Sequence, residues 1–156
     1  MTRLRSQRKL ERIKGARFPL KVNKSDISGD GVFAVEAIPW GVKIIEFRGA
    51  VISDAEAERR AAEGASAIME LGVNRNVDGF DRGNGAALIN HGRREANCCL
   101  LRENGRVWII AGIEGVEAGA ELTYDYGSDY YPRKGKRLYR NSGQRDMLDI
   151  AQVDKR

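Results

Sequence analysis

The sequence predicts a mainly β fold with one helix. Short runs of β-branched and aromatic residues recur between glycines, of which the chain has 18. Only residues 53–64 combine the start and stop signals of a helix. The chain also lacks the regular alternation of helix and strand that is typical of nucleotide-binding α/β folds.

The expected strands follow from period-two patterns bounded by turn residues: 21–24, 31–38, 42–52, 99–103, 106–111 and 121–126. Turns at 25–30 and 39–41 separate the first three strands. Asn104-Gly105 is the best short hairpin signal, because both residues tolerate positive φ. It should join the fourth and fifth strands.

The expected helix begins at a capping box, in which Ser53 accepts from first-turn amides and Glu56 reaches back to the cap. An alanine- and charge-rich stretch continues to about Glu63, and Gly64 is a stop signal.

Length and charge predict one domain between two basic extensions. Residues 1–17 hold seven lysines and arginines against one glutamate and predict a flexible arm. Residues 18–132 form the domain, with 12 basic and 18 acidic residues, and residues 133–156 form a basic tail with eight basic against three acidic residues. The extensions are either solvated ends or a surface for nucleic acid, and the sequence leaves both open.

The cysteines and the apolar runs restrict the class of protein. Cys98 and Cys99 are adjacent and form neither a disulfide framework nor a metal-binding spacing, which predicts a reducing, intracellular compartment and no metal. No apolar run approaches the ~20 residues that span a bilayer, so no membrane contact is expected. The basic start lacks the apolar run of a secretory signal.

Three short segments hold the candidate functional residues. Asn90 precedes the only histidine, His91, at a predicted strand-to-loop junction. His91 could be an ordinary core residue, or the pair could bind a ligand, and the sequence leaves both interpretations open. Tyr124 and Tyr126 share one face of the last strand. The Gly29–Gly31 turn opens onto a strand rather than a helix, so it is no dinucleotide fingerprint, but glycine allows a ligand close to the backbone.

Four segments resemble, in order, the motifs of the SET-domain protein-lysine N-methyltransferases: 28–34, 34–49, 77–98 and 121–127. The resemblance covers about residues 18–132. It implies a β-clip-like SET fold of several small twisted sheets with few short helices and a C-terminal pseudoknot, in which the tyrosine-bearing strand threads near the Asn90-His91 loop. The pre-SET and zinc-binding post-SET cysteines of the family are absent, so the form is compact, and its cofactor lid would come from residues 130–150, largely in the basic tail, without metal, or from a partner.

The resemblance assigns roles to individual residues. The residues implied to bind S-adenosylmethionine are Gly29, Asp30, Gly31, Asn90, His91 and Tyr131. Tyr126 would be the catalytic tyrosine, and Phe47, Tyr124 and Tyr126 would line the channel for the substrate lysine. Such chemistry needs alignment and a neutral amine rather than a metal, and desolvation lowers the pKa of a lysine. The Tyr124 hydroxyl occupies space that further methyl groups need, which predicts mono- or dimethylation.

Several departures from the family keep an alternative open. Phe47 replaces a tyrosine, Ala67 stands where a tyrosine that contacts the cofactor is common, and residues 92–96 lack the expected serine and proline. The alternative is a SET-like module of weak or no activity that binds basic peptides, chromatin or nucleic acid. For the active enzyme, a histone tail or another basic protein is the expected substrate, in the nucleus of a eukaryote or otherwise in the cytoplasm.

Overall fold

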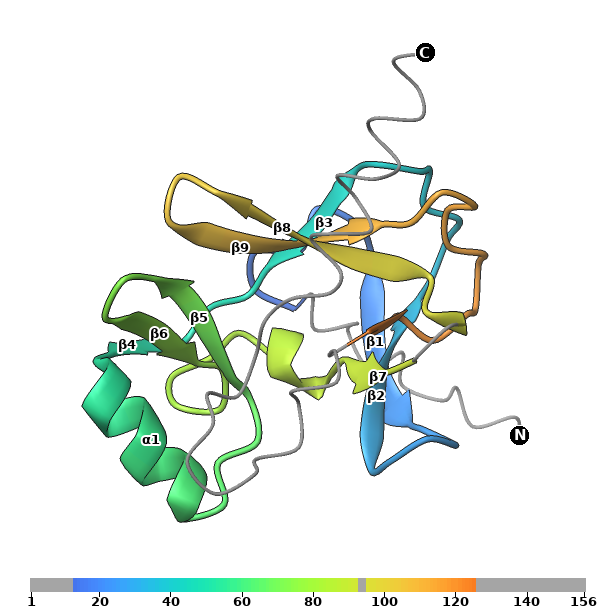
Figure 1. Ribbon diagram of the computed structural model, residues 1–156. Helices are drawn as coiled ribbons and strands as arrows, with labels where there is room; N and C mark the ends of the chain where they lie inside the picture. Colours follow the sequence, from blue (N-terminus) through green and yellow to red (C-terminus); the bar gives the residue numbers. More distant parts are fainter. Residues whose placement is uncertain (1–12, 93–94, 126–156) are drawn as a thin grey trace.

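The computed structural model describes residues 13–92 and 95–125, and Figure 1 shows how their elements are arranged. The first sheet is an antiparallel ribbon of β1 (Leu20–Lys24) and β2 (Asp30–Ala34), with Lys24 opposite Asp30. The turn at residues 25–29 between these strands ends at Gly29, whose φ of +48° is in the left-handed region that favours glycine.

The second sheet has three antiparallel strands in the order β4-β6-β5. They are β4 (Ala50–Ile52), β5 (Ile68–Gly72) and β6 (Arg75–Asp78). Helix α1 (Asp54–Ala62) lies between β4 and β5 in sequence, beside the sheet in Figure 1. Arg60 anchors the helix to the end of the sheet, since its Nη1 lies 3.0 Å from Asp78 Oδ2 and 2.8 Å from Asp81 Oδ2.

The third sheet has five strands in the order β3-β9-β8-β10-β7 and contains the threaded connection. Its members are β3 (Lys43–Glu46), β7 (Asn90–His91), β8 (Cys98–Glu103), β9 (Arg106–Ala111) and β10 (Thr123–Tyr124). Strand β10 lies between β7 and β8 and is parallel to both. Because β7 and β8 are consecutive in sequence, the loop 92–97 that joins them has to cross β10. A short 3₁₀ helix, η1 (Ala86–Leu88), precedes β7.

One apolar core joins the three sheets. Its largest fully buried side chains include Leu20 from β1, Ile45 from β3, Met69 from β5, Leu100 from β8 and Ile109 from β9. Burial of one such side chain contributes about 1.5–3 kcal/mol. The sheets therefore form a single body rather than separate units, and the segments at their junction are held in place by the core.

The structure confirms most of the predicted elements. The mainly β class is confirmed, and so are the strands 21–24, 99–103 and 106–111. Asn104 and Gly105 have φ values of +52° and +71°, as a two-residue hairpin loop requires. Helix α1 ends one residue before the predicted limit. Gly64, with φ +101°, follows it.

Three predicted elements were wrong in their extent. The run 42–52 is divided into β3 and β4, which belong to different sheets. Strand 31–38 ends at Ala34, and Ile38 only bridges to Val116. Of strand 121–126, the structure gives β10 at Thr123–Tyr124, and Glu121 bridges to Phe33 instead.

The capping box is only half formed. Ser53 Oγ accepts from the Glu56 amide at 3.2 Å, as predicted. The Glu56 carboxylate, however, accepts from the side chains of Arg59 and Arg60. These hydrogen bonds, the one from Arg59 first, lower the pKa of Glu56 to about 2. The two arginines one turn away therefore compete successfully with the backbone amide at the cap.

Candidate functional site

The candidate site lies where β10 passes between β7 and β8. Thr123 pairs with Asn90 and Tyr124 pairs with His91, so the two sequence motifs are direct neighbours in the sheet. On the other side Tyr124 pairs with Cys98. Residues 33 positions apart in the sequence therefore pair, because the last described strand is inserted between two earlier ones.

Gly92 allows the crossing loop to lie directly against β10. Its amide donates to the Tyr124 carbonyl at 3.1 Å. A methyl group added at Gly92 would lie 2.6 Å from Thr123 Cβ, closer than packed atoms approach. In this chain, Gly92 therefore packs closely against Thr123.

Asn97 holds β10 from the opposite end of the same loop. Its Nδ2 donates to the Glu121 carbonyl at 2.8 Å, and its Oδ1 accepts from the Thr123 amide at 2.9 Å. One side chain thereby satisfies backbone groups on both sides of Leu122, which is fully buried. Asn97 fixes the position at which the chain enters β10.

Asn90 connects the threaded strand to the glycine turn. Its Nδ2 donates to the backbone carbonyls of Ser28 at 3.0 Å and Asp30 at 3.2 Å, and to Glu121 Oε1 at 2.9 Å. The predicted cofactor-binding residues of the turn, Gly29, Asp30 and Gly31, are thus brought beside Asn90. The Asn90 amide group itself is occupied in holding this turn.

The Glu121 carboxylate completes the same network. It accepts from Ser25 Oγ at 2.7 Å through Oε1 and lies 2.9 Å from the same hydroxyl through Oε2. Ser25 Oγ in turn accepts from the Ile27 amide at 2.9 Å. A methyl group added at Gly31 would lie 2.8 Å from Glu121 Cδ, so Gly31 is needed for this close approach rather than for its φ.

His91 lies at the edge of the site, where its side chain is 19% exposed. Its Nδ1 is 3.8 Å from Oδ1 of Asp125. The segments 25–31, 90–92 and 120–125 together contain four acidic residues and no lysine or arginine. These acidic residues are Asp26, Asp30, Glu121 and Asp125. A cation is therefore favoured here over an anion.

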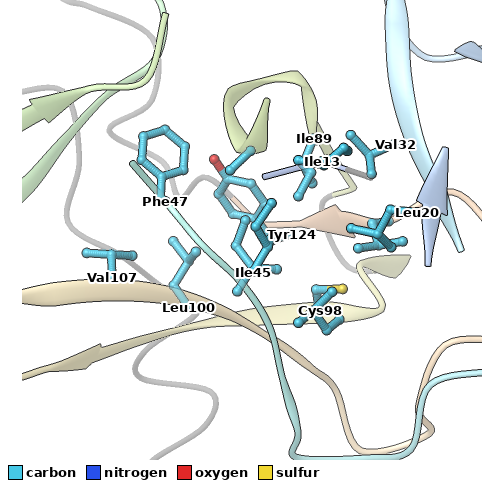
Figure 2. Close-up of a cluster of buried hydrophobic side chains, with 14 of the residues drawn as sticks. Ile13, Leu20, Val32, Ile45, Phe47, Ile89, Cys98, Leu100, Val107 and Tyr124 are labelled. Carbon is cyan, nitrogen blue, oxygen red and sulfur yellow. The ribbon is translucent and has the colours of Figure 1, made fainter. Parts of the chain in front are cut away.

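Phe47 and Tyr124, which the resemblance places along the substrate channel, both belong to the buried core. Both residues are only 3% exposed. In Figure 2 the Tyr124 ring lies between Ile45 and Ile89, and its hydroxyl oxygen points to the side on which Phe47 lies. Phe47 is also packed against Gly79, where an added methyl group would lie 2.6 Å from the Phe47 Cζ atom. Both channel candidates in the described part of the chain therefore lie in one apolar cluster.

The remaining predicted positions are Tyr126, Tyr131 and Ala67. Tyr126 and Tyr131 lie outside the described residues, as do residues 1–12 of the predicted arm 1–17 and the whole tail 133–156. Ala67 is buried, and its carbonyl accepts from the Gly79 amide at 2.9 Å. Sequence reasoning gave no role to Ser25, Asn97 or Glu121. Glu121 and Asn97 stood within the recognised motifs, but nothing local in the sequence indicates their partners.

Cys98 is a buried part of this region. Its Sγ lies 3.4 Å from Asn97 Oδ1, and burial raises the pKa of the thiol to about 12. No three side chains of the types that ligate metals gather within residues 13–92 and 95–125. In the same part of the chain, none of the helices has the length and apolar character needed to cross a bilayer.

Small sheets joined by a strand threaded beside an Asn-His pair define the chain as a SET-type β protein. The family model described as "SET domain" matches residues 29–127. This match spans more than half of the chain, and the chain belongs to the SET domain family. The resemblance first seen in the four sequence motifs is confirmed.

Curated relatives similar to this chain are named as histone-lysine N-methyltransferases. One from Mycosarcoma maydis, "H3 lysine-4 specific", is 29% identical over 132 residues, which is 76% of this chain and 9% of the relative. The set1 protein of Dictyostelium discoideum is 32% identical over 75% of this chain and 8% of its own length. ASHH1 of Arabidopsis thaliana is 33% identical over 71% of this chain and 24% of its own length. The chain thus spans less than a quarter of these relatives.

Proposed function

We propose that this chain is a protein-lysine N-methyltransferase that uses S-adenosylmethionine. The observation on which this rests is the insertion of β10 beside Asn90-His91, because it brings the tyrosine-bearing motif to the candidate cofactor residues. Membership of the SET domain family supports the same reaction. The names of the relatives support a histone tail, or a similarly basic segment, as the substrate.

The residues around β10 fit this cofactor. Gly29 has no side chain, and no atom lies within 4 Å of the place where a Cβ would stand, so a ligand can approach the backbone of the turn there, whereas the space beside Gly31 is taken by the Glu121 carboxylate. The described segments 25–31, 90–92 and 120–125 contain four carboxylates, which suit a positively charged sulfonium. S-adenosylmethionine would supply an electrophilic methyl group. Asn90 would hold the turn, and His91 would contact the bound molecule at the rim.

The chain's aromatic residues would position the amine and exclude water. Tyr124 and Phe47 are buried in the same apolar cluster, and this environment disfavours an ammonium charge, so the pKa of an entering lysine falls. The neutral amine is the nucleophile. Tyr126 would orient it through its hydroxyl group. The Tyr124 hydroxyl takes up space beside the amine, which supports mono- and dimethylation as the main products.

The test is methyl transfer from labelled S-adenosylmethionine to a peptide with the sequence of a histone H3 tail. We expect transfer by the wild-type chain, and a sharp loss in Tyr126→Phe with unchanged folding. Trp40→Phe changes an exposed aromatic side chain outside the candidate site and is the control. Mass spectrometry of the peptide tests the degree of methylation. Equal activity of Tyr126→Phe and wild type would contradict the assignment, and dominant trimethyl product would contradict the role of Tyr124.

The departures at Phe47 and Ala67 favour one second candidate, a SET-like module that binds basic peptides without modifying them. Cofactor binding in calorimetry together with absent transfer to every lysine peptide would support it. The basic ends could add nucleic-acid binding to either function. A mobility shift with duplex DNA at low salt that is lost on deletion of residues 1–17 would support that contact. A histone substrate would place the protein at chromosomes.

A further inference from the structure

Glu121 lies at the centre of a hydrogen-bond network that the proposed catalytic steps do not use. Its carboxylate joins Ser25 at one end of the glycine turn to Asn90 at the start of the threaded region. Ser25 and Glu121 are 96 residues apart in sequence. The contact is therefore a tertiary tie between the turn and the segment that enters β10.

The backbone on both sides of the carboxylate is fixed as well. The amide of Leu122 donates to the Val32 carbonyl at 2.7 Å, and Ala34 donates to the Ala120 carbonyl at 2.9 Å. Glu121 is therefore held beside β2, with its side chain directed at Ser25 and Asn90. Gly31 leaves the space that the carboxylate occupies.

The carboxylate is suited to this task by its acceptor capacity. Two oxygens can accept from a hydroxyl and an amide at once, and hydrogen bonds to an ionised group are stronger than neutral ones. Ser25 connects the Glu121 carboxylate to the backbone of the turn, because its Oγ also accepts from the Ile27 amide. Removal of the carboxylate would release Ser25 and leave Asn90 as the remaining side-chain tie to the turn.

We infer that Glu121 is a positioning residue that holds the Ser25–Gly31 turn in the form that binds the cofactor. The effect on cofactor binding rests on the proposed function, whereas the effect on the structure of the turn does not. Glu121 touches no reacting atom in this account. Its loss should weaken cofactor binding and raise KM for the cofactor while leaving KM for the peptide nearly unchanged.

The experiment uses the full chain with four variants: Glu121→Ala, Glu121→Gln, Ser25→Ala and the matched control Glu117→Ala. Hydrogen exchange of the ligand-free protein is measured first over residues 25–31. We expect faster exchange in Glu121→Ala and Ser25→Ala, and no change in the control, whose carboxylate is exposed. Unchanged exchange in both of the first two variants would overturn the positioning role.

Calorimetry then measures the Kd of S-adenosylmethionine. We expect an increase of up to about tenfold in Glu121→Ala, because a lost hydrogen bond worth about one decade in an equilibrium constant can lower the population of the binding-competent turn by at most that factor. A smaller increase is expected in Ser25→Ala. Glu121→Gln should recover most of the affinity, since the amide oxygen can still accept from Asn90 and the amide nitrogen can donate to Ser25 Oγ.

The two readouts separate this inference from the proposed function. If wild type binds the cofactor and folded Glu121→Ala and Ser25→Ala bind it equally well, the inference is wrong. If wild type does not bind the cofactor but exchange over 25–31 still depends on Glu121, the positioning stands and the cofactor role of the turn is refuted. If Glu121→Ala does not fold, Ser25→Ala gives the decision, because it removes only one hydroxyl group.

Discussion

Replacement of Asn97 by alanine tests whether one side chain secures the threaded strand. The variant would leave the Thr123 amide and the Glu121 carbonyl without their partners. Thr123 is only 7% exposed, so water reaches this position poorly. An unsatisfied buried polar group costs about 1–3 kcal/mol, and two of them cost about 2–6 kcal/mol in total. Single domains have stabilities of about 5–15 kcal/mol, so the loss should be a large share of the total.

The assay is urea unfolding followed by circular dichroism, with Asn23→Ala as the matched control. Asn23 Oδ1 accepts only from the exposed Lys24 amide, so its loss should cost less than about 0.5 kcal/mol. Both variants should keep the native spectrum without denaturant. A free energy of unfolding for Asn97→Ala that falls no further than that of Asn23→Ala would refute the reasoning.

Three further predictions concern other parts of the molecule. Gly49→Ala places a methyl group 2.6 Å from the Asp78 carbonyl carbon and should lower the free energy of unfolding in urea by at least about 1–3 kcal/mol. In the control Gly72→Ala the added methyl group meets nothing within 4 Å, so stability should hardly change. Equal losses in the two variants would contradict this explanation. Cys98 should resist maleimide at about pH 8 until the protein unfolds, because its raised pKa suppresses the thiolate; peptide mapping that finds native-state labelling would disagree. The ionised Glu56 carboxylate stabilises the fold at any pH above its ordinary pKa of 4.5, and this contribution is lost as the pH falls toward its lowered pKa of about 2. The difference in unfolding free energy between wild type and Glu56→Gln should therefore shrink in acid. A difference that does not change with pH would argue against the pairing with the arginines.

Elements with local causes were predictable from the sequence. Asn104-Gly105 fixes a two-residue turn by its own backbone preferences, and the hairpin follows. Helix α1 follows from Ser53 at its start and Gly64 beyond its end. In each case the decisive interaction lies within a few residues of the signal.

Elements with distant causes were not predictable. The run 42–52 divides near Gly49 because the backbone of Asp78 occupies the space beside it, 29 positions further along the chain. The hairpin of β5 and β6 was missed, although Asn74, with φ +53°, is a residue suited to its turn. Its strands lack a clear period of two, and Met69 and Val77 are buried by tertiary packing.

The candidate site was predictable in part for the same reason. The Asn90-His91 pair and the Tyr124 motif could be recognised as short patterns, and β10 brings them together as expected. The supporting contacts of Glu121 with Ser25 and Asn90 join three segments distant in sequence. Only the folded arrangement shows which acceptor satisfies which donor.

The most direct test of the central claim is a titration of the isotope-labelled chain with S-adenosylhomocysteine, followed by amide chemical shifts. If the glycine turn and the Asn-His pair form one cofactor site, the signals of Gly29, Gly31, Asn90 and His91 should move together with a single Kd. Val73, exposed at the tip of the β5–β6 hairpin, should not move. Saturable binding that shifts other residues and leaves these four unchanged would contradict the account.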